Sequence, residues 1–388
     1  MTFLVYLLLG FSVLIGNVYK FSLFSPDIRI SFLDISVTLI TIISWRRNYT
    51  STIKQFSHLT KPIFIFFSVC LLSLIPAFFR YGQIPALVGL LYSLRWLVYS
   101  LFFISLCLLK IPIRRLIILI SCILVFTGLA QYIFIPDTRF LFALNWDDHF
   151  NRVIGTILDP GFLGLLYVFI LLFTKNKVLW IASFIALVLT YSRASYLAYI
   201  AGYAFSKRSF IKILLLLTIT VTLLPRPGGD GVKLERVYSI FSRFGSWQQA
   251  LRIFSDHPIL GVGFNVYRYA QRDYGFENDL KWLVSHANAG SDSSLLFILA
   301  TTGLLGFTVY LWYFYRLTTH NPQLTPAVVA LLVHSIFLNS LFYPFVLLWL
   351  ALVMADNLQP SPSPSGSPPH PQPRSSAGSH RKRVPIAT

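Results

Sequence analysis

The feature that most constrains this chain is a series of apolar stretches that recurs along almost its whole length. A helix that crosses a bilayer needs roughly 20 apolar residues, and about twelve stretches approach this length. Backbone amides cannot stay unpaired in hydrocarbon, so each stretch is expected to be a helix. The stretches are centred near Leu8, Ile40, Val69, Val98, Leu124, Leu166, Phe184, Leu197, Leu216, Gly303, Leu331 and Leu348.

The composition agrees with this pattern. Of the 388 residues, 55% are hydrophobic and only 12% are charged, and the mean hydropathy is +0.67. These values lie far outside the range of soluble domains. The sequence therefore predicts an all-α fold, a polytopic membrane bundle of about twelve transmembrane helices.

One long hydrophilic segment, residues 225–292, interrupts the apolar series. It divides the chain into a transmembrane bundle (1–224), a large extracytoplasmic loop (225–292), C-terminal transmembrane helices (293–357) and a tail (358–388). The tail is rich in Pro, Ser and basic residues and is expected to be disordered. Within the loop, we expect a helix over 246–255, with Trp247, Ala250, Leu251 and Phe254 on one face, which ends before the turn residues Pro258, Gly261 and Gly263.

Basic residues in the short loops predict the orientation, because Lys and Arg are retained on the cytoplasmic side. Those that follow the second, fourth, sixth and eighth spans all fall on one side of the membrane. They are Arg46, Arg47, Lys54, Lys61, Lys110, Arg114, Arg115, Lys175, Lys177, Lys207, Arg208 and Lys212. This places both termini in the cytoplasm, and puts residues 225–292 and the shorter loop 136–159 outside.

The net charge of +18 has two expected origins. Most of it anchors the cytoplasmic loops against anionic membrane lipids. The remainder clusters on the outer side, where it would suit an anionic group and where a nucleic-acid partner is not expected. This cluster comprises Arg226, Lys233, Arg236, Arg243, Arg252, Arg268, Arg272 and Lys281.

Two arginines within the apolar series are candidates for function, because charge inside a membrane is costly. Arg193 lies at the outer end of the tight connection between the seventh and eighth spans, where an interfacial snorkelling role is the alternative. Arg95 lies inside the fourth span beside Trp96, and we expect it to form a structural ion pair or a cation–π contact.

Four segments of the chain are informative when taken together. They are RVIGTILDPGFLG at 152–164, YSRASYL at 191–197, RFGSWQQALRIFSDHPILGVGFNVY at 243–267, and SLLFILATTGLLG at 294–306. Each segment is weak alone. In their order and spacing, and with the single large loop, they resemble the O-antigen ligase and Wzy-type polysaccharide polymerase superfamily.

The resemblance implies an integral-membrane glycosyltransferase, similar to the GT-C type, that acts in cell-surface polysaccharide biosynthesis at the cytoplasmic membrane. Such enzymes move a glycan from undecaprenyl diphosphate to an acceptor hydroxyl on the outer face, and flippase and chain-length regulator proteins are possible partners. Arg193 matches the family's span-end arginine, and Arg243 matches the arginine four residues before the loop tryptophan, Trp247. Both would bind the diphosphate, with Arg152 and Arg252 as secondary candidates. We expect no cofactor and no metal, because the arginines supply the positive charge.

The general base departs from the family pattern. The resemblance places a His-Asn pair eleven residues before the first Gly of GLLG, where this chain has Asp292, while His286 lies six residues further upstream. Either side chain could accept the proton of the attacking hydroxyl. The alternative for Asp292, with Ser293 and Ser294, is a purely structural N-cap of the next span.

Two further alternatives stay open at this stage. A ligase would recognise a lipid A-core acceptor and a polymerase a second lipid-linked repeat unit; the Asp-Ser pair before GLLG favours a polymerase. A solute transporter would need polar groups along the whole membrane path, whereas here they gather on the outer side.

Overall fold

The computed structural model describes residues 1–359 apart from 24, 47–48, 145, 207–209, 236, 279–281 and 284–289. Its first half comprises α1 (Thr2–Ile15), β1 (Lys20–Leu23), β2 (Ser25–Ser31), α2 (Phe32–Trp45), α3 (Tyr49–Gln55), α4 (Ser57–Tyr81), α5 (Gln83–Leu108), α6 (Ile113–Phe134), η1 (Arg139–Leu144), η2 (Gly155–Ile157) and α7 (Pro160–Phe173). Its second half comprises α8 (Lys177–Val188), α9 (Arg193–Ala204), α10 (Phe210–Leu223), η3 (Asp230–Val232), α11 (Tyr238–Asp256), α12 (Tyr267–Asp273), α13 (Ser294–His320), η5 (Pro322–Leu324), α14 (Thr325–His334) and α15 (Pro344–Leu358).

Each of the predicted span centres lies in a separate helix. Four of these helices, α4, α5, α6 and α13, are long and apolar enough to cross a membrane. The others are shorter, and most of them are strongly apolar. The structure thus confirms a mostly helical protein with four helices that could span a membrane, while the full number of spans stays a prediction.

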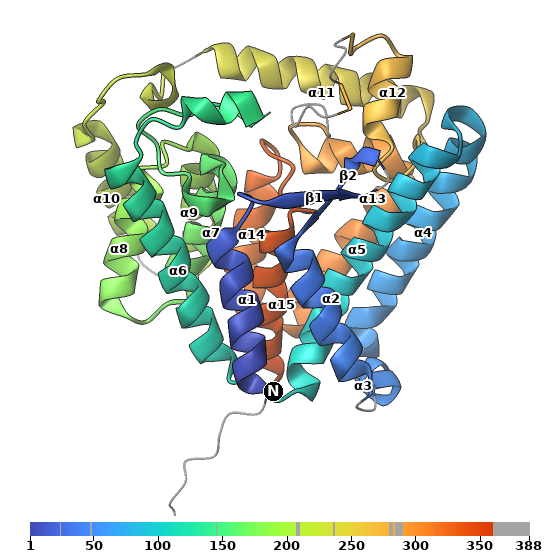
Figure 1. The fold of residues 1–388 in the computed structure, drawn as a ribbon, viewed down its shortest axis with the longest axis horizontal. Helices are drawn as coiled ribbons and strands as arrows, with labels where there is room; N and C mark the ends of the chain where they lie inside the picture. The colour runs from blue at the N-terminus through green and yellow to red at the C-terminus, as the bar shows by residue number, and fades with distance from the viewer. Residues whose placement is uncertain are drawn as a thin grey trace, which may run out of the picture.

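The helices form a bundle with two different ends (Figure 1). The amphipathic helix α11, the short helix α12 and the β-hairpin lie at one end, and the N-terminus and the C-terminal end of α15 lie at the other. At that second end Tyr6 donates a hydrogen bond to the carbonyl of Pro112, and Arg114 pairs with Asp356. The N-terminus and the end of α15 therefore lie at the end of the bundle opposite to α11 and α12, and the compartment that each end faces stays a prediction.

Helices α7 and α15 form the centre of the bundle. Nearly all their side chains are buried, from Leu163 to Leu171 in α7 and from Phe345 to Ala355 in α15. A helix that is apolar on all sides must be surrounded by other helices or by lipid. The other spans pack around this centre and leave their outer faces, such as Phe79 of α4 and Phe126 of α6, exposed.

The all-α prediction missed an antiparallel hairpin between α1 and α2. In it Lys20 pairs with Ser31, Phe21 with Ile30 and Ser22 with Arg29. Isoleucines at 28 and 30 alternate with arginine at 29, which is a strand period of two. The hairpin lies at the α11 end of the bundle, beyond the apolar stretches (Figure 1), where an open sheet edge can meet water.

The helix predicted over 246–255 is present and is longer in the structure, where it runs from Tyr238 to Asp256. Of the residues expected on its packed face, Ala250 is buried and Trp247 packs on Phe337, whereas Leu251 is 47% exposed. Ile253 is buried as well. The packed side is therefore centred on Ala250, and Leu251 lies outside it.

Helix α13 is broken at Gly303, and the segment that follows α11 fills the break. Gly303 has φ 66° and ψ −168°, a conformation essentially restricted to glycine. The amides of Val262 and Gly263 donate to the carbonyls of Ala300 and Thr301, both at 3.0 Å. On the other side of the break, the amide of Leu304 donates to the carbonyl of Pro258 at 2.8 Å. Two separated sequence motifs, HPILGVG and TTGLLG, thus form one interlocked unit.

We predict that Gly303→Ala destabilises the protein by about 2 kcal/mol or more, because the added Cβ would be strained at this φ/ψ. It would also overlap the backbone carbonyl group of Ile259. The matched control is Gly245→Ala in α11, where a Cβ meets nothing within 4 Å. Thermal unfolding of the purified protein in detergent measures both; equal melting temperatures for the two variants would refute the interlock.

Candidate functional site

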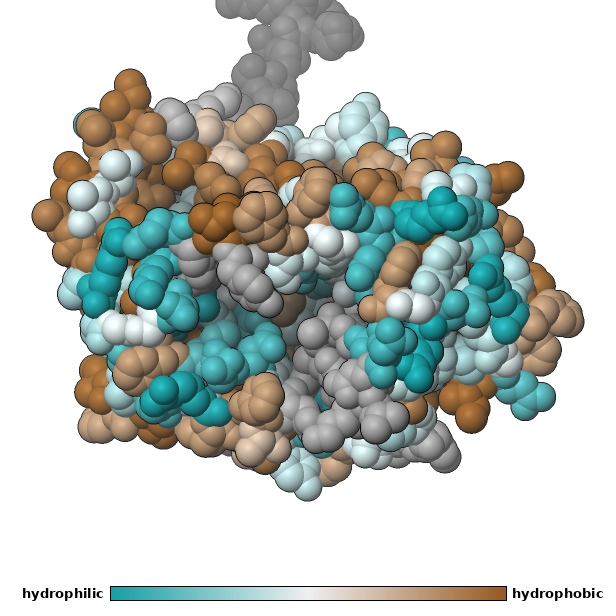
Figure 2. Space-filling view, turned by 90° about the horizontal axis from the view of Figure 1, so that it is seen from above, coloured by the Kyte–Doolittle hydropathy of each residue, from teal (hydrophilic) through white to brown (hydrophobic). Residues whose placement is uncertain are grey.

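A cavity of about 110 Å³ at the α11 end brings three predicted arginines together. Arg152, Arg193 and Arg243 line it, along with His149, Asp159 and Ser192. We call it the arginine cavity. Seen from this end, hydrophilic side chains surround a hollow in the middle of the face, and hydrophobic side chains dominate the rim (Figure 2). Residues far apart in the chain thus place positive charge at one point.

The turn before α9 sets the position of Arg193. Ser192 caps the helix by accepting a hydrogen bond from the amide of Ser195. Buried Arg152 donates to the carbonyls of Thr190 (2.9 Å) and Tyr191 (3.5 Å), so it holds the same turn from below. Arg193 itself donates to the carbonyl of Leu234 at 3.0 Å and ties the large loop to the bundle. Arg152 is therefore a positioning residue for Arg193 as well as part of the cavity wall.

Arg243 reaches the same cavity from α11. Its guanidinium lies over the ring of Phe337 at 6.0 Å, and Trp247, one turn later, packs on the same ring at 6.2 Å. Burial lowers the pKa of Arg243; Asp292 and Asp159 oppose this shift, while Arg193 adds to it. The guanidinium nevertheless stays charged at any accessible pH. Two neighbouring cations in a partly buried site favour a bound anion.

A larger cavity of about 340 Å³ adjoins the arginine cavity, and both are lined by Asp159 and Leu338. We call it the central cavity. Asp159 is the N-cap of α7, where it accepts hydrogen bonds from the amides of Gly161 (2.7 Å) and Phe162 (2.9 Å) ahead of Pro160 at the first helical position. Burial raises the pKa of Asp159, and these two amides limit the rise.

Asp292 lines the central cavity and does not cap α13. The cap is Ser293, whose hydroxyl accepts from the amide of Leu296, while the amide of Asp292 donates to the Ser246 hydroxyl at 3.1 Å. The carboxyl is therefore available to the cavity. Burial raises the pKa of Asp292, Arg243 opposes the rise, and Asp147 adds to it. A carboxylate with a raised pKa beside Arg243 can accept a proton.

The other two candidates do not join this group. Arg252 points away from both cavities, with 66% of its side chain exposed, and pairs with Asp256 one turn later at 3.5 Å. A solvated i,i+4 pair of this kind is common on helix surfaces. His286 lies outside the described residues.

The structure also brings together charges that the sequence interpretation did not connect. Four further cations line the central cavity: Lys20, Arg29, Arg95 and Arg268. Of these, Arg95 forms the ion pair expected of it, a bidentate contact with Asp34 at 2.7 and 2.6 Å. The sequence signal for this group was the presence of charged residues in segment 20–29, between two apolar stretches. These residues come close to α5 and α12 only because the segment folds into the hairpin.

Within the described ranges, the acidic, histidine and cysteine side chains form no group of three that could hold a metal ion. The cations that line the two cavities are instead arginine and lysine side chains.

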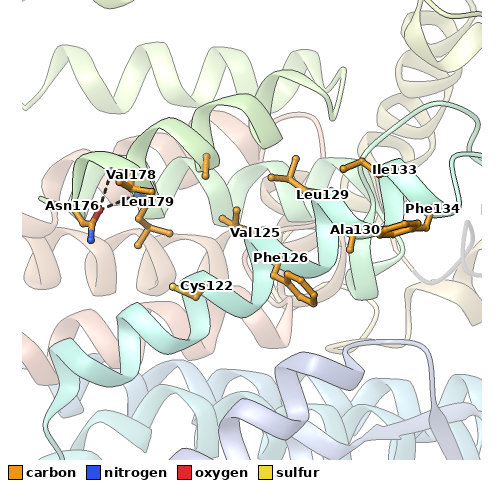
Figure 3. Close-up of a pocket in the computed structure, with 11 residues that line it drawn as sticks. Cys122, Val125, Phe126, Leu129, Ala130, Ile133, Phe134, Asn176, Val178 and Leu179 are labelled. Carbon is orange, nitrogen blue, oxygen red and sulfur yellow. Dashed lines mark hydrogen bonds between the residues drawn. The ribbon is translucent and has the colours of Figure 1, made fainter.

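An apolar groove of about 500 Å³ runs along the outside of α6 (Figure 3). Its walls carry α6 side chains from Cys122 to Phe134 on one side and Val178 and Leu179 of α8 on the other. At the Phe134 end, the Gln131 side chain accepts from the amides of Ile154 (2.9 Å) and Gly155 (3.1 Å), close in sequence to Arg152. The Phe134 end of the groove therefore lies close to the segment that precedes α7.

Comparison with known families agrees with this geometry. Residues 234–311 match the family model described as O-Antigen ligase, so this part of the chain is similar to that family. The match spans α11, α12 and the first part of α13, including the interlock at Gly303. It confirms the resemblance to the O-antigen ligase and Wzy-type superfamily. A search of curated proteins finds no match. The apolar helices and this domain support a membrane enzyme of the ligase or polymerase type in cell-surface glycan biosynthesis.

We predict that Arg243→Gln raises the pKa of Asp292 further, because Arg243 is the group that lowers it. Infrared titration of the carboxylic C=O band measures this pKa, and the Asp292→Asn variant assigns the band. As the control, Arg252→Gln removes a similar charge outside the cavities and should leave the band unchanged. A pKa that does not respond to Arg243→Gln would show that the two groups do not interact.

Proposed function

We propose that this protein transfers a glycan from a polyprenyl diphosphate carrier to a hydroxyl of an acceptor sugar, on the outer face of the cytoplasmic membrane. The observation that carries the proposal is the convergence of Arg193 and Arg243 with Asp292 at adjoining cavities. Two of these residues, Arg243 and Asp292, belong to the segment that matches the O-antigen ligase family.

The roles follow from the charges. Arg193 and Arg243 hold the diphosphate, since guanidinium groups bind phosphate oxygens bidentately. The acceptor oxygen attacks the anomeric carbon as the bond from that carbon to the diphosphate oxygen breaks. The electron pair leaves with polyprenyl diphosphate, and the hydroxyl proton passes to Asp292. In-line attack inverts the anomeric centre.

The groove along α6 suits the carrier's lipid chain. It is apolar, it faces the surroundings of the bundle, and its Phe134 end lies near the segment that bears Arg152. A polyprenyl chain seated there would bring its diphosphate to the arginine cavity. Charge at one end and an apolar wall along the remainder match the two halves of the carrier.

The acceptor distinguishes a polymerase from a ligase, and we place the polymerase first. The Asp292-Ser293 pair before GLLG resembles polymerase-type members. In the structure the two residues have different roles: Ser293 caps α13, and Asp292 lines the central cavity. A ligase that uses a lipid A-core acceptor is the alternative.

We predict that Arg193→Ala and Arg243→Ala each slow glycan transfer by about 10²-fold or more, because each removes charge that stabilises the departing diphosphate. The assay uses purified protein in detergent and a synthetic polyprenyl-diphosphate repeat unit, and it follows a ladder of lipid-linked products. The matched control is Arg252→Gln, whose side chain lies outside the cavities. Unchanged turnover in both arginine variants would refute the site. Loss of turnover in a chelator, restored by magnesium, would refute a metal-free mechanism.

The same assay identifies the base. We expect Asp292→Asn to abolish transfer and His286→Ala to retain it; the reverse result would assign the role to His286. Because only the ionised carboxylate accepts a proton, activity should fall as the pH drops through the pKa of Asp292. Burial raises this pKa, so the fall should occur above the value of about 4 that is usual for aspartate. An acid limb that is identical in Asp292→Asn and wild type would exclude Asp292.

A further inference from the structure

The turn at the end of α14, residues 334–340, contacts the elements that carry the proposed site residues. It begins at His334, the last residue of α14, which is completely buried. The match to the O-antigen ligase family ends at residue 311, so this turn lies outside the matched segment. We propose that His334 is a positioning residue, which sets the spacing of Arg193 and Arg243 for one diphosphate group. This inference rests on the proposed function, because it concerns the same site.

The imidazole of His334 bridges two serine hydroxyls. Its Nε2 lies 3.3 Å from the hydroxyl of Ser195 on α9, and its Nδ1 lies 2.6 Å from the hydroxyl of Ser340. Both serines are completely buried. These partners carry no charge, and an isolated buried charge is costly, so the imidazole is neutral. One of its ring nitrogens therefore donates a hydrogen bond and the other accepts one.

The hydrogen bonds of Ser195 indicate which ring nitrogen carries the proton. Its hydroxyl donates to the carbonyl of Gly161 at 3.1 Å. A carbonyl can only accept, so the single hydroxyl proton of Ser195 is used there. Nε2 of His334 then donates to Ser195, and Nδ1 accepts from Ser340. The other tautomer would direct the Ser340 proton to the carbonyl of Leu338, a weaker bond at 3.5 Å.

Ser195 connects His334 to the turn that carries Arg193. The hydroxyls of Ser195 and Ser192 lie 2.8 Å apart, and Ser192 is the cap of α9, directly before Arg193. Through the carbonyl of Gly161, the Ser195 hydroxyl also holds the first turn of α7. Ser192 and Gly161 both belong to the wall of the arginine cavity. A shift of the imidazole would therefore move this wall.

The backbone of His334 is connected to the contacts of Arg243. Its carbonyl accepts hydrogen bonds from the amides of Phe337 (3.0 Å) and Leu338 (3.1 Å), and these bonds close the turn. The Arg243 guanidinium lies over the ring of Phe337, and Leu338 lines both cavities. The side chain and the backbone of one residue thus reach the contacts that hold the two arginines.

The same turn also holds the start of α13. The carbonyl of Ser335 accepts from the amide of Ser294 (2.9 Å) and from the hydroxyl of Ser293 (3.2 Å). Ser293 is the cap of α13 and directly follows Asp292. The 334–340 turn therefore contacts the segments that carry both diphosphate-binding arginines and the proposed base.

His334 and Ser195 do not form a catalytic pair. A serine nucleophile activated by a histidine must reach its substrate. Both side chains are completely buried, and neither is among the described residues that line the two cavities. Their role is therefore to position the groups that touch the diphosphate.

Equilibrium binding of short prenyl carriers tests this role, with the full-length protein in lipid nanodiscs. The two probes are farnesyl diphosphate and farnesyl phosphate. Two correctly spaced arginines hold both phosphates of one diphosphate. We therefore expect the wild type to bind the diphosphate about tenfold more tightly than the monophosphate, a factor that one additional charge-assisted contact allows.

The variants remove the connection in steps. Ser195→Ala cuts the link to α9 and leaves the imidazole in place, and His334→Leu removes the imidazole. We expect both to lose the preference for the diphosphate and to slow glycan transfer by about tenfold or more, because the arginines are misplaced. His334→Gln should keep most of the preference, since its side-chain amide can donate in place of Nε2.

The matched control is Ser183→Ala in α8. It removes an equally buried hydroxyl, one that forms no hydrogen bond within the described part of the chain. This variant should bind both probes as the wild type does. Thermal unfolding of every variant separates positioning from folding. An unchanged preference in folded Ser195→Ala would overturn the inference, and so would equal preferences in His334→Leu and His334→Gln.

The binding test also separates this inference from the proposed function. If the wild type prefers the diphosphate, loses this preference in Ser195→Ala and transfers no glycan, the proposed function fails and the positioning role stands. If the wild type transfers glycan and Ser195→Ala keeps both the preference and the rate, the positioning role fails and the proposed function stands. Equal binding of the two probes by the wild type would also overturn the positioning role.

Discussion

The break in α13 is the interaction on which the rest of the site depends. A helix that loses its hydrogen bonds at Gly303 leaves buried carbonyls and amides that need partners. The segment from Pro258 to Gly263 supplies them with backbone groups of its own, and positive φ at Gly261 (65°) and Gly263 (107°) allows the close approach. The end of α11 is thereby attached to the bundle. Arg243, several turns earlier on α11, is held over the cavity by this attachment and by Phe337.

The charges of the site come from elements that the chain separates widely. Arg193 starts α9, Arg243 lies on α11, Asp159 caps α7 and Asp292 precedes α13. Each residue is positioned by a local contact. Ser192 caps α9 next to Arg193, and the Phe337 ring packs against Arg243. Two amides of α7 bind Asp159, and Ser293 caps α13 next to Asp292. Their meeting point is hydrophilic and lies at one end of an apolar bundle, so charge that would be costly in the membrane is kept at its edge.

Residue types and spacing in the sequence pointed to several residues that the structure brings together. Three candidate arginines share a cavity, the position of each apolar stretch corresponds to a helix, and Arg95 forms its ion pair. The errors have physical causes. Arg252 was grouped with the site because it shares a loop with Arg243, yet it projects from a different side of α11 and pairs with Asp256. The hairpin at 20–31 was overlooked because its strands are short and lie between strong apolar signals.

What the sequence by itself determined is the solvent in which the chain folds and the chemical class of its site. Long apolar stretches require helices in hydrocarbon, and arginines in a hydrophilic loop indicate an anionic ligand, because both conclusions depend only on local composition. The tertiary structure decided which charges meet. The position of α11, the fold of the hairpin beside the central cavity and the break in α13 depend on contacts between distant segments, and no local pattern encodes those contacts.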